Sequence, residues 1–338
     1  MKRTGNIFES LISTENLMLA FQEARRNKKN YREVKEFEKD IPGNIAKLRH
    51  LLQSGQWRVF GYRHFRRFDG NKFRVIDWDP YFPDNIVQHA IQQTAGQVLL
   101  KSGISDTYAG IRGRGVHRAM KRVRHFLSEY LDLQPIYILK IDIRKFYQSI
   151  DTEILKRKIR RKIKDRRVLA LYDELIDSHP AGLPIGNYIS QALANYYLSD
   201  FDHWIKDQRF RHYARYCDDI VVIDSDKDRL RDLLSEIRIH LQADKLTIKD
   251  NAQIFPIERF GIDFVGYVFR RHQTILRKST ERKFRRAARI FIEQPTEKHF
   301  QSLSSYYGWI KWLSHGKRLW YSLFDKDLQT LHKEIAKC

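Results

Sequence analysis

The segment Tyr216-Cys217-Asp218-Asp219 is the feature that most limits how this chain folds. It is followed by Ile, Val, Val and Ile, a run of β-forming residues. Two adjacent acids beside such a run are typical of the turn of a β-hairpin. Neighbouring carboxylates repel each other, so a fold keeps them together only where solvent or cations neutralise them. The sequence therefore predicts a hairpin whose turn is either a solvated loop or a cation site.

A second acidic strand end favours the cation site. Residues 137–147 have the pattern of a strand, with Asp142 near its end after an apolar run. Hard cations such as Mg²⁺ bind oxygen ligands and usually need only a few carboxylates. Two such ions about 3.5–4 Å apart stabilise both the attacking and the leaving oxygens of a phosphoryl transfer. Carboxylates at two neighbouring strand ends indicate this chemistry, which nucleic-acid polymerases use.

The charge of the chain indicates a polyanionic partner. The 63 Lys and Arg residues exceed the 41 Asp and Glu residues, which gives a net charge of +22. Basic residues concentrate in segments 112–124, 156–167 and 270–318, and aromatic residues accompany the last of these. A single basic cluster is usually a solvated helix face. Three clusters with aromatics favour a nucleic-acid track, with a membrane surface as the weaker alternative.

Composition also excludes several classes of protein. The only cysteines are Cys217 and Cys338, so no disulfide framework or cysteine zinc site is expected. The thirteen histidines have no metal-binding spacing. No apolar run has transmembrane length, and no apolar core follows the N-terminal Met-Lys-Arg-Thr. We therefore expect a soluble, cytoplasmic protein that does not associate with membranes.

Local patterns predict most of the secondary structure. Apolar spacing predicts helices, and β-forming runs around Asp-Gly-Asn predict a hairpin at 57–78 with its turn at 69–71. Strands are expected over 246–269. Residues 7–53 are expected to be mostly helical, with Gly55 as the residue after the last turn. The further predicted helices are 84–91, 116–131, 153–164 capped by Asp151 or Thr152, a helix containing 192–201, 229–241, one around Phe284–Phe291, 296–313 and 318–335.

Two further segments are candidates for substrate contact. Lys72 and Arg74 are two residues apart on a strand, so both side chains point to one face, where paired cations suit a triphosphate. An exposed strand face without a ligand explains the pair equally well. The segment 182–191 is rich in Gly and Pro, residues that allow the backbone to approach a ligand closely.

The order of these segments resembles the reverse transcriptases, over about residues 57–270. The resemblance implies that Asp142, Asp218 and Asp219 are catalytic and that two Mg²⁺ ions are held by Asp142, Asp218, Asp219 and the carbonyl of Ile143. It also implies a primer-gripping hairpin at 264–267 and a steric gate at Tyr147, for which core packing is the alternative. The implied dNTP-binding residues are Lys72, Arg74, Phe146, Tyr147, Ile185, Gly186 and Gln191. The implied nucleic-acid-binding residues are Arg112, Arg114, Arg282, Arg285, Arg286 and Arg289.

A narrower resemblance lies in the loop. Ile185-Gly186-Asn187 and Ser190-Gln191 are similar to the loop of reverse transcriptases from diversity-generating retroelements, whereas most bacterial and viral relatives have Pro-Gln-Gly. That group copies a template RNA into cDNA with errors concentrated at adenines. The resemblance implies template RNA, a cDNA or DNA primer and dNTPs as partners, together with an accessory variability determinant protein that is oligomeric.

The resemblance implies an α/β (α+β) chain with the right-hand polymerase fold. Its expected parts are fingers at 1–135, an antiparallel-sheet palm at 136–268 with a basic helical insertion at about 152–180, and a helical thumb at 269–338. The alternatives within enzymes are reverse transcriptases of the group II intron, retron or defence type. A non-catalytic nucleic-acid-binding module is the alternative of another class, and the three intact acids argue against it.

Overall fold

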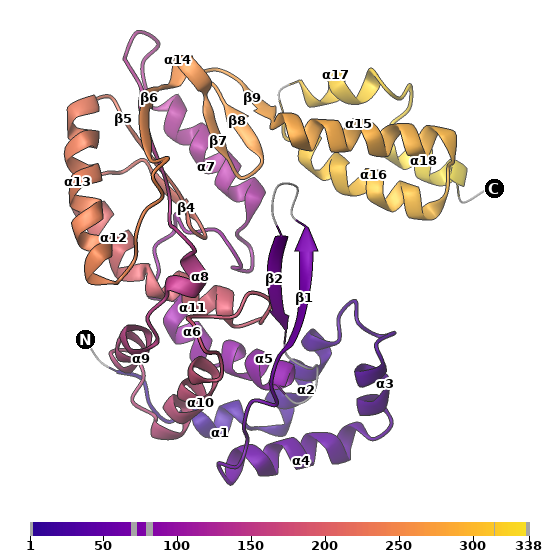
Figure 1. Cartoon of the computed structure of the whole chain (residues 1–338). Coiled ribbons are helices and arrows are strands. Elements are labelled where there is room, and N and C mark those ends of the chain that lie inside the picture. Colours follow the sequence, from indigo (N-terminus) through magenta and orange to yellow (C-terminus); the bar gives the residue numbers. More distant parts are fainter. Residues whose placement is uncertain (1–2, 69–72, 79–83, 314, 336–338) are drawn as a thin grey trace. The chain divides into compact units, whose positions relative to one another are not determined.

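A computed structural model describes residues 3–68, 73–78, 84–313 and 315–335 (Figure 1). Contacts between residues divide the chain into two compact units, each built from several segments. Unit 1 comprises Met1–Gly110, Asp142–Arg209 and Ser235–Asp250, and unit 2 comprises Ile111–Ile141, Phe210–Leu234 and Asn251–Cys338. The boundaries of fingers, palm and thumb stay a prediction.

The first part of unit 1 is helical, as its apolar spacing predicts. Its helices are α1 (Phe8–Leu11), α2 (Thr14–Ala24), α3 (Arg32–Glu38), α4 (Ile41–Gln53), α5 (Ile86–Gln93) and α6 (Ala95–Leu100). Helix α2 packs against both α4 and α5 and buries Leu17, Ala20 and Phe21. Helix α4 ends at its C-cap Ser54, and Gly55 follows, as predicted.

An antiparallel ribbon of two strands, β1 (Arg63–Phe68) and β2 (Phe73–Trp78), confirms the predicted hairpin (Figure 1). The first strand begins at Arg63, however, and not at Trp57. Trp57 is buried, and its amide donates to the carbonyl of Leu51, 3.1 Å away, so this segment packs with α4 instead. The turn at 69–71 and Lys72 lie outside the described residues, and only the backbone of Arg74 is described.

The second part of unit 1 contains the basic helices. Its elements are α8 (Phe146–Ser149), α9 (Thr152–Arg160), α10 (Arg166–Asp177), α11 (Ser190–Tyr197) and α12 (Ser199–Asp207). Asp151 caps α9, since its carboxylate accepts from the amide of Ile154 at 2.9 Å. The predicted extension of this helix to residue 164 is wrong, because Asp165 caps a new helix by accepting from the amides of Arg167 and Val168.

The centre of unit 2 is a four-stranded sheet in the order β4-β5-β3-β6. Its strands are β3 (Tyr137–Asp142), β4 (Tyr213–Tyr216), β5 (Asp219–Asp224) and β6 (Gln253–Pro256), and the β4–β5 and β3–β6 pairs are antiparallel. Helix α7 (Val116–Ser128) packs against β4, and α13 (Lys227–Ala243) runs from unit 2 into unit 1. The expected strand 137–147 stops at Asp142, because Lys145 takes a left-handed conformation (φ 46°) that starts α8.

A smaller sheet follows in unit 2, with antiparallel strands β7 (Ile262–Phe264), β8 (Tyr267–Phe269) and β9 (Thr274–Leu276). The short helix α14 (Ile257–Phe260) interrupts the strands expected over 246–269. The strand β9 also delays the helix that was expected directly after Arg270.

Unit 2 ends with α15 (Lys278–Glu293), α16 (Glu297–Ile310), α17 (Gly316–Tyr321) and α18 (Leu328–Ile335), and α15 lies beside α16 (Figure 1). The predicted apolar stripe of α15 is buried: it consists of Phe284, Ala287, Ala288 and Phe291. The single helix expected at 318–335 is instead two helices. No helix in the described ranges has both the length and the apolar character that crossing a bilayer requires.

Candidate active site

Asp142 is the last residue of β3, and the segment after it is held in unit 1. The amide of Lys249 donates to the carbonyl of Asp142 at 2.8 Å, and Ile143 forms an antiparallel bridge with Ile248. The ammonium group of Lys249 forms an ion pair with the Asp142 carboxylate, whose side chain is about one-third exposed. The first predicted carboxylate is therefore fixed by a backbone pairing and neutralised by a lysine.

The turn at Tyr216–Asp219 is a β-hairpin, as predicted. Tyr216 pairs with Asp219, so Cys217 and Asp218 form a two-residue turn. Cys217 has φ 60°, a left-handed conformation that is uncommon for a residue other than glycine. The fully buried Arg215 donates to the carbonyl of Cys217 at 2.9 Å, which stabilises this conformation.

An ion pair with Lys140 connects the turn to the neighbouring strand β3. Asp219 begins β5, which is the neighbour of β3 in the four-stranded sheet. The ammonium group of Lys140 on β3 forms an ion pair with the Asp219 carboxylate. Because residues two apart on a strand face the same side, Lys140 shares a face of β3 with the final residue, Asp142. Asp219 thus contacts β3 at Lys140.

The chemistry of these donors fits a hard cation. Within the described ranges, no group of three or more His, Cys, Asp or Glu side chains is arranged to bind a metal ion. The Oδ1 atom of Asp142 is buried and makes no hydrogen bond to the described residues, although the ammonium group of Lys249 lies beside it. Carboxylate oxygens of this kind are typical Mg²⁺ ligands, and a cation would compete with Lys249 for this oxygen.

The loop 182–191 begins against helix α8, which carries Phe146 and Tyr147. The amide of Leu183 donates to the carbonyl of Tyr147 at 2.8 Å. Gly182 has φ 57°, and a Cβ atom there would collide with the same carbonyl oxygen. Only glycine therefore fits this position without moving the backbone. The Phe146 ring is buried and lies 5.6 Å from the ring of Tyr147, measured between centroids.

The middle of the loop lies against the end of β2. The amide of Asp77 donates to the carbonyl of Ile185 at 2.8 Å. A Cβ atom on Gly186 would lie 2.8 Å from the carbonyl oxygen of Asp77, and Gly186 has φ 131°. The loop approaches β2 this closely because position 186 has no side chain.

The end of the loop is held by helix α5. The amide of Ile189 donates to Oε1 of the buried Gln88 at 3.1 Å. The rings of His89 and Tyr188 stack with centroids 3.6 Å apart and an interplanar angle of 12°. Burial lowers the pKa of His89 to about 4, so its imidazole is neutral at physiological pH. Gln191, at the end of the loop, packs against Gly110.

The structure brings four of the predicted dNTP-binding residues to this one loop: Tyr147, Ile185, Gly186 and Gln191. Asp77, Gln88 and His89 also hold the loop, and they were not predicted from the sequence. Gln88 and His89 could have been noticed in the sequence as two polar residues within the apolar run of α5. Every residue of that run from Ile86 to Ile91 is buried. The contacts of Lys72 and of the Arg74 side chain lie outside what the structure describes.

The predicted nucleic-acid-binding arginines lie in unit 2. Arg112 is exposed, and Arg114 is partly buried just before α7. The four arginines of α15 are exposed, opposite its buried stripe: Arg282, Arg285, Arg286 and Arg289. Their predicted contacts with phosphates stay a prediction.

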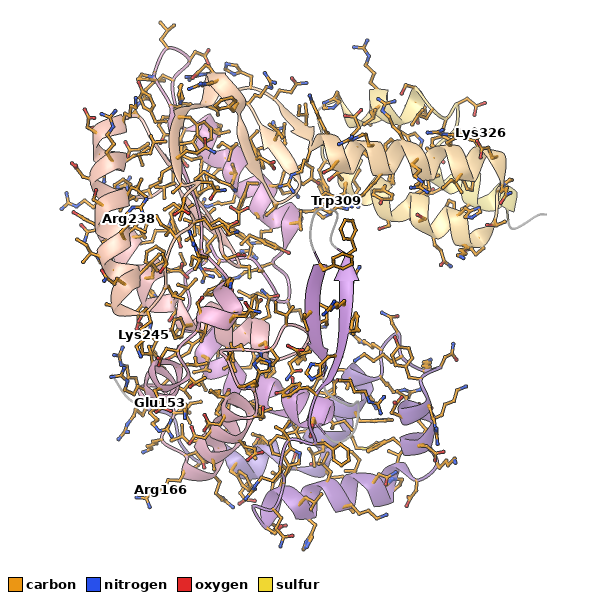
Figure 2. The ribbon with its side chains drawn as sticks, in the orientation of Figure 1. Glu153, Arg166, Arg238, Lys245, Trp309 and Lys326 are labelled. Atoms are coloured by element: carbon orange, nitrogen blue, oxygen red, sulfur yellow. The ribbon has the colours of Figure 1, made fainter. Side chains whose placement is uncertain are left out.

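The predicted primer-gripping segment is the turn between β7 and β8. Val265 and Gly266 form this turn, and both have positive φ values, 46° and 84°. The ring of Trp309, which belongs to α16 and is labelled in Figure 2, packs against Gly266. The hydroxyl of Tyr267 also donates to the carbonyl of Trp309 at 3.1 Å. The hairpin is therefore braced by a helix of the C-terminal group.

Comparison with known proteins decides the family. Residues 84–268, more than half of the chain, match the family model described as Reverse transcriptase (RNA-dependent DNA polymerase). The matched segment includes Asp142, the loop 182–191 and the Tyr216–Asp219 turn. The chain belongs to the reverse transcriptase family.

A curated relative of this reverse transcriptase family member is Protein YkfC of Escherichia coli (strain K12). It is 26% identical over 180 residues, which cover 50% of this chain and 47% of YkfC. The chain thus spans about half the length of this relative.

Solved telomerases of Candida tropicalis have a similar fold. The apo telomerase matches with a TM-score of 0.52 and 14% identity, over 83% of this chain and 59% of the telomerase chain. A form truncated from its C-terminal domain matches with a TM-score of 0.51 and 14% identity, over 70% of this chain and 60% of the telomerase chain. The telomerase in complex with the TWJ fragment of telomeric RNA matches with a TM-score of 0.51 and 13% identity, over 79% of this chain and 57% of the telomerase chain. The predicted α+β right-hand polymerase fold is confirmed.

Proposed function

We propose that this chain is an RNA-directed DNA polymerase that makes cDNA from a template RNA. The observation that carries the proposal is the Tyr216–Asp219 hairpin, whose Asp219 pairs with Lys140 of β3, inside the segment that matches the family. The net charge of +22 supports binding to RNA and DNA, because phosphate contacts dominate nucleic-acid affinity.

The carboxylates have the roles that polymerisation requires. Asp142 and Asp218 bind the catalytic cations with the carbonyl of Ile143, and Asp219 supports them. Two Mg²⁺ ions, when bound, supply positive charge at the attacking and leaving oxygens of the phosphoryl transfer. Lys140 and Lys249 balance the charge of Asp219 and Asp142.

The loop and its neighbours select the nucleotide. Tyr147 lies where the loop begins and excludes a ribose 2′-hydroxyl by its bulk. Ile185 and Gly186 support the nascent base pair, with Phe146 and Gln191 beside them. Lys72 and Arg74 bind the triphosphate. Most of the rate then comes from positioning and from charge neutralisation, because the protein has little covalent chemistry to perform.

The finer assignment is to a diversity-generating retroelement. The residues Ile185-Gly186-Asn187 and Ser190-Gln191 support it by their similarity to that group. We propose that the chain misincorporates opposite template adenines and works with an oligomeric accessory variability determinant protein. The other bacterial classes, of group II intron, retron or defence type, remain the alternative.

One experiment tests both levels of the proposal. An RNA template with a DNA primer is incubated with the chain, dNTPs and Mg²⁺, with and without the candidate accessory protein, and the cDNA is sequenced. Extension that depends on Mg²⁺ supports the polymerase, and no extension under either condition overturns it. Errors concentrated opposite adenine support the retroelement assignment, and errors spread evenly over the four bases overturn that assignment alone.

A further inference from the structure

The ribbon β1–β2 depends on its base for its position. Every residue of β1 is exposed, and a two-stranded ribbon alone is marginally stable in water. The strand β2 includes position 74, which the proposed function assigns to the triphosphate. The contacts at the base of the ribbon therefore decide where this part of the nucleotide site lies.

Asp77 is the centre of those contacts. Its Oδ1 atom lies 2.5 Å from Nδ1 of His64, its partner across the ribbon, and its Oδ2 atom lies 3.2 Å from Nε2 of His179. A carboxylate only accepts hydrogen bonds, so both histidine nitrogens donate. The Asp77 and His179 side chains are only 15% and 11% exposed, so solvent weakens the bond between these two residues little.

The backbone of Asp77 contacts the loop at the same time. Its amide donates to the carbonyl of Ile185, and its own carbonyl oxygen fills the space that a side chain on Gly186 would need. Asp77 thus binds the loop with its main chain and the segment before the loop, at His179, with its side chain.

A second set of contacts joins the same two regions. The hydroxyl of Tyr62, one residue before β1, lies 2.6 Å from Oγ of Ser178. The side-chain amide of Asn187 donates to the Tyr62 hydroxyl at 3.3 Å. The rings of Tyr62 and His179 meet edge to face with centroids 5.5 Å apart. The base of the ribbon and the segment 178–187 therefore form one connected network.

We propose that Asp77 is a positioning residue for the incoming deoxynucleoside triphosphate, an inference that rests on the proposed function. Through its bonds to His64, His179 and Ile185, it fixes the strand assigned to the triphosphate against the loop assigned to the base pair. The spacing of the two halves of the nucleotide site depends on this bridge, because a one-residue slip of a strand would exchange its faces. Asp77 acts through these neighbours and does not itself touch the nucleotide.

The variant Asp77→Asn tests the inference, since it keeps the shape and the backbone amide but removes the charge. We expect the KM for dNTP in primer extension to rise about tenfold, because hydrogen bonds to a charged group are the stronger kind. We expect kcat to stay within about twofold, since a loss of binding shared by ground and transition states raises KM alone.

Two further variants make the result specific. Glu33→Gln removes the charge of the group that accepts the 3.1 Å bond from Arg63, a bond that ties the ribbon to α3 but not to the loop, and should leave KM unchanged. His64→Ala removes one arm of the bridge at a side chain that is 63% exposed, so it should fold normally and raise KM in the same direction as Asp77→Asn. Thermal melting confirms that each variant is folded.

Hydrogen exchange gives a readout that does not need activity. Without nucleotide or template, Asp77→Asn and His64→Ala should speed amide exchange in peptides covering 75–78 and 182–187, and Glu33→Gln should not. Unchanged exchange in both bridge variants, or a KM no higher than that of Glu33→Gln, would overturn this inference alone. A wild-type chain that never extends a primer would overturn the proposed function and the inference with it.

Discussion

The turn Tyr216–Asp219 and the loop Gly182–Gln191 build their sites in opposite ways. The turn has two adjacent acids, and Lys140 neutralises one of them. The loop contains no charged residue, and backbone hydrogen bonds and close packing hold it in place. Both contain residues with positive φ, which are glycines in the loop but Cys217, stabilised by Arg215, in the turn.

This difference separates two kinds of effect. In the proposed function, the acids of the turn hold the cations that stabilise the transition state of phosphoryl transfer, so changes there should lower the rate. In the same proposal, the shape of the loop selects the nucleotide, so changes there should alter selection or local stability and leave the chemistry intact. A turn variant that alters nucleotide selection, or a loop variant that lowers the rate of the chemistry, would show that the two regions do not have separate roles.

The largest effect is expected at the turn. Asp218→Asn removes a carboxylate that the cations need, and we expect kcat for primer extension to fall by at least about 10²–10³-fold. RNA affinity, measured by filter binding, should be unchanged, because we expect it to come from the many Lys and Arg side chains. The control is Asp250→Asn, which neutralises an acid that is 91% exposed and should keep the wild-type rate. Near-normal extension by Asp218→Asn would refute the cation assignment.

The next effect is expected where the loop meets α8. Tyr147→Ala should admit ribonucleotides, and discrimination between dNTP and rNTP should fall by up to about a hundredfold, the limit that shape alone reaches against an added hydroxyl. The measurement is the ratio of kcat/KM values for matched dNTP and rNTP. Tyr147→Phe keeps the ring and should keep the discrimination. If a folded Tyr147→Ala enzyme discriminates as well as wild type, Tyr147 only packs in the core.

The sequence predicted those parts of the molecule that local patterns determine. The hairpin around Asp218 followed from two acids beside a β-forming run. A cap at Asp151 or Thr152 followed from their place before a helix, and Asp151 is the residue that forms it. The buried stripe of α15 followed from helical spacing. In each case neighbours along the chain supply the partners, so the pattern is visible without the fold.

The errors arise where distant segments decide the outcome. Trp57 is not part of the strand predicted to begin there, because its amide donates to the carbonyl of Leu51 near the end of α4. Asp77 gave no signal because its partners His179 and Ile185 lie about a hundred residues away in the chain. The sequence marked the glycines of the loop, but only the structure shows which backbone oxygens they approach.

The stack of His89 on Tyr188 gives the stability of the loop a dependence on pH. Burial lowers the pKa of His89 from 6.5 to about 4, so the unfolded chain binds this proton more tightly than the folded chain. The stability that neutral His89 contributes is complete above the unfolded pKa and is lost as the pH falls through 6.5 toward 4.

His89→Phe should keep the stack and remove this dependence. Relative to its value at neutral pH, we expect wild-type stability at about pH 5 to fall by about 2 kcal/mol more than that of the variant. Urea unfolding at both pH values measures the difference. Parallel losses in the two proteins would show that His89 is accessible to protons in the folded state.

The smallest effect is expected at Ile185. It is the most specific test of the difference between loop and turn, because it concerns nucleotide selection alone. Its carbonyl is held by Asp77, whereas its side chain is β-branched and can neither donate nor accept a hydrogen bond. The corresponding Gln of other family members has an amide that can bond near the sugar of the incoming nucleotide. One such bond contributes about 0.5–1.5 kcal/mol, which is up to about tenfold in an equilibrium.

Ile185→Gln should therefore lower misincorporation several-fold opposite template adenine, within the range of about 0.5–1.5 kcal/mol for one hydrogen bond, and less opposite the other three bases. Error frequencies per template base, from sequenced cDNA of wild type and variant at matched extension, measure this. Ile185→Val is the control, because it keeps an apolar β-branched side chain and should keep the adenine errors. An equal change at all four bases, or none at adenine, would leave Ile185 as a packing residue.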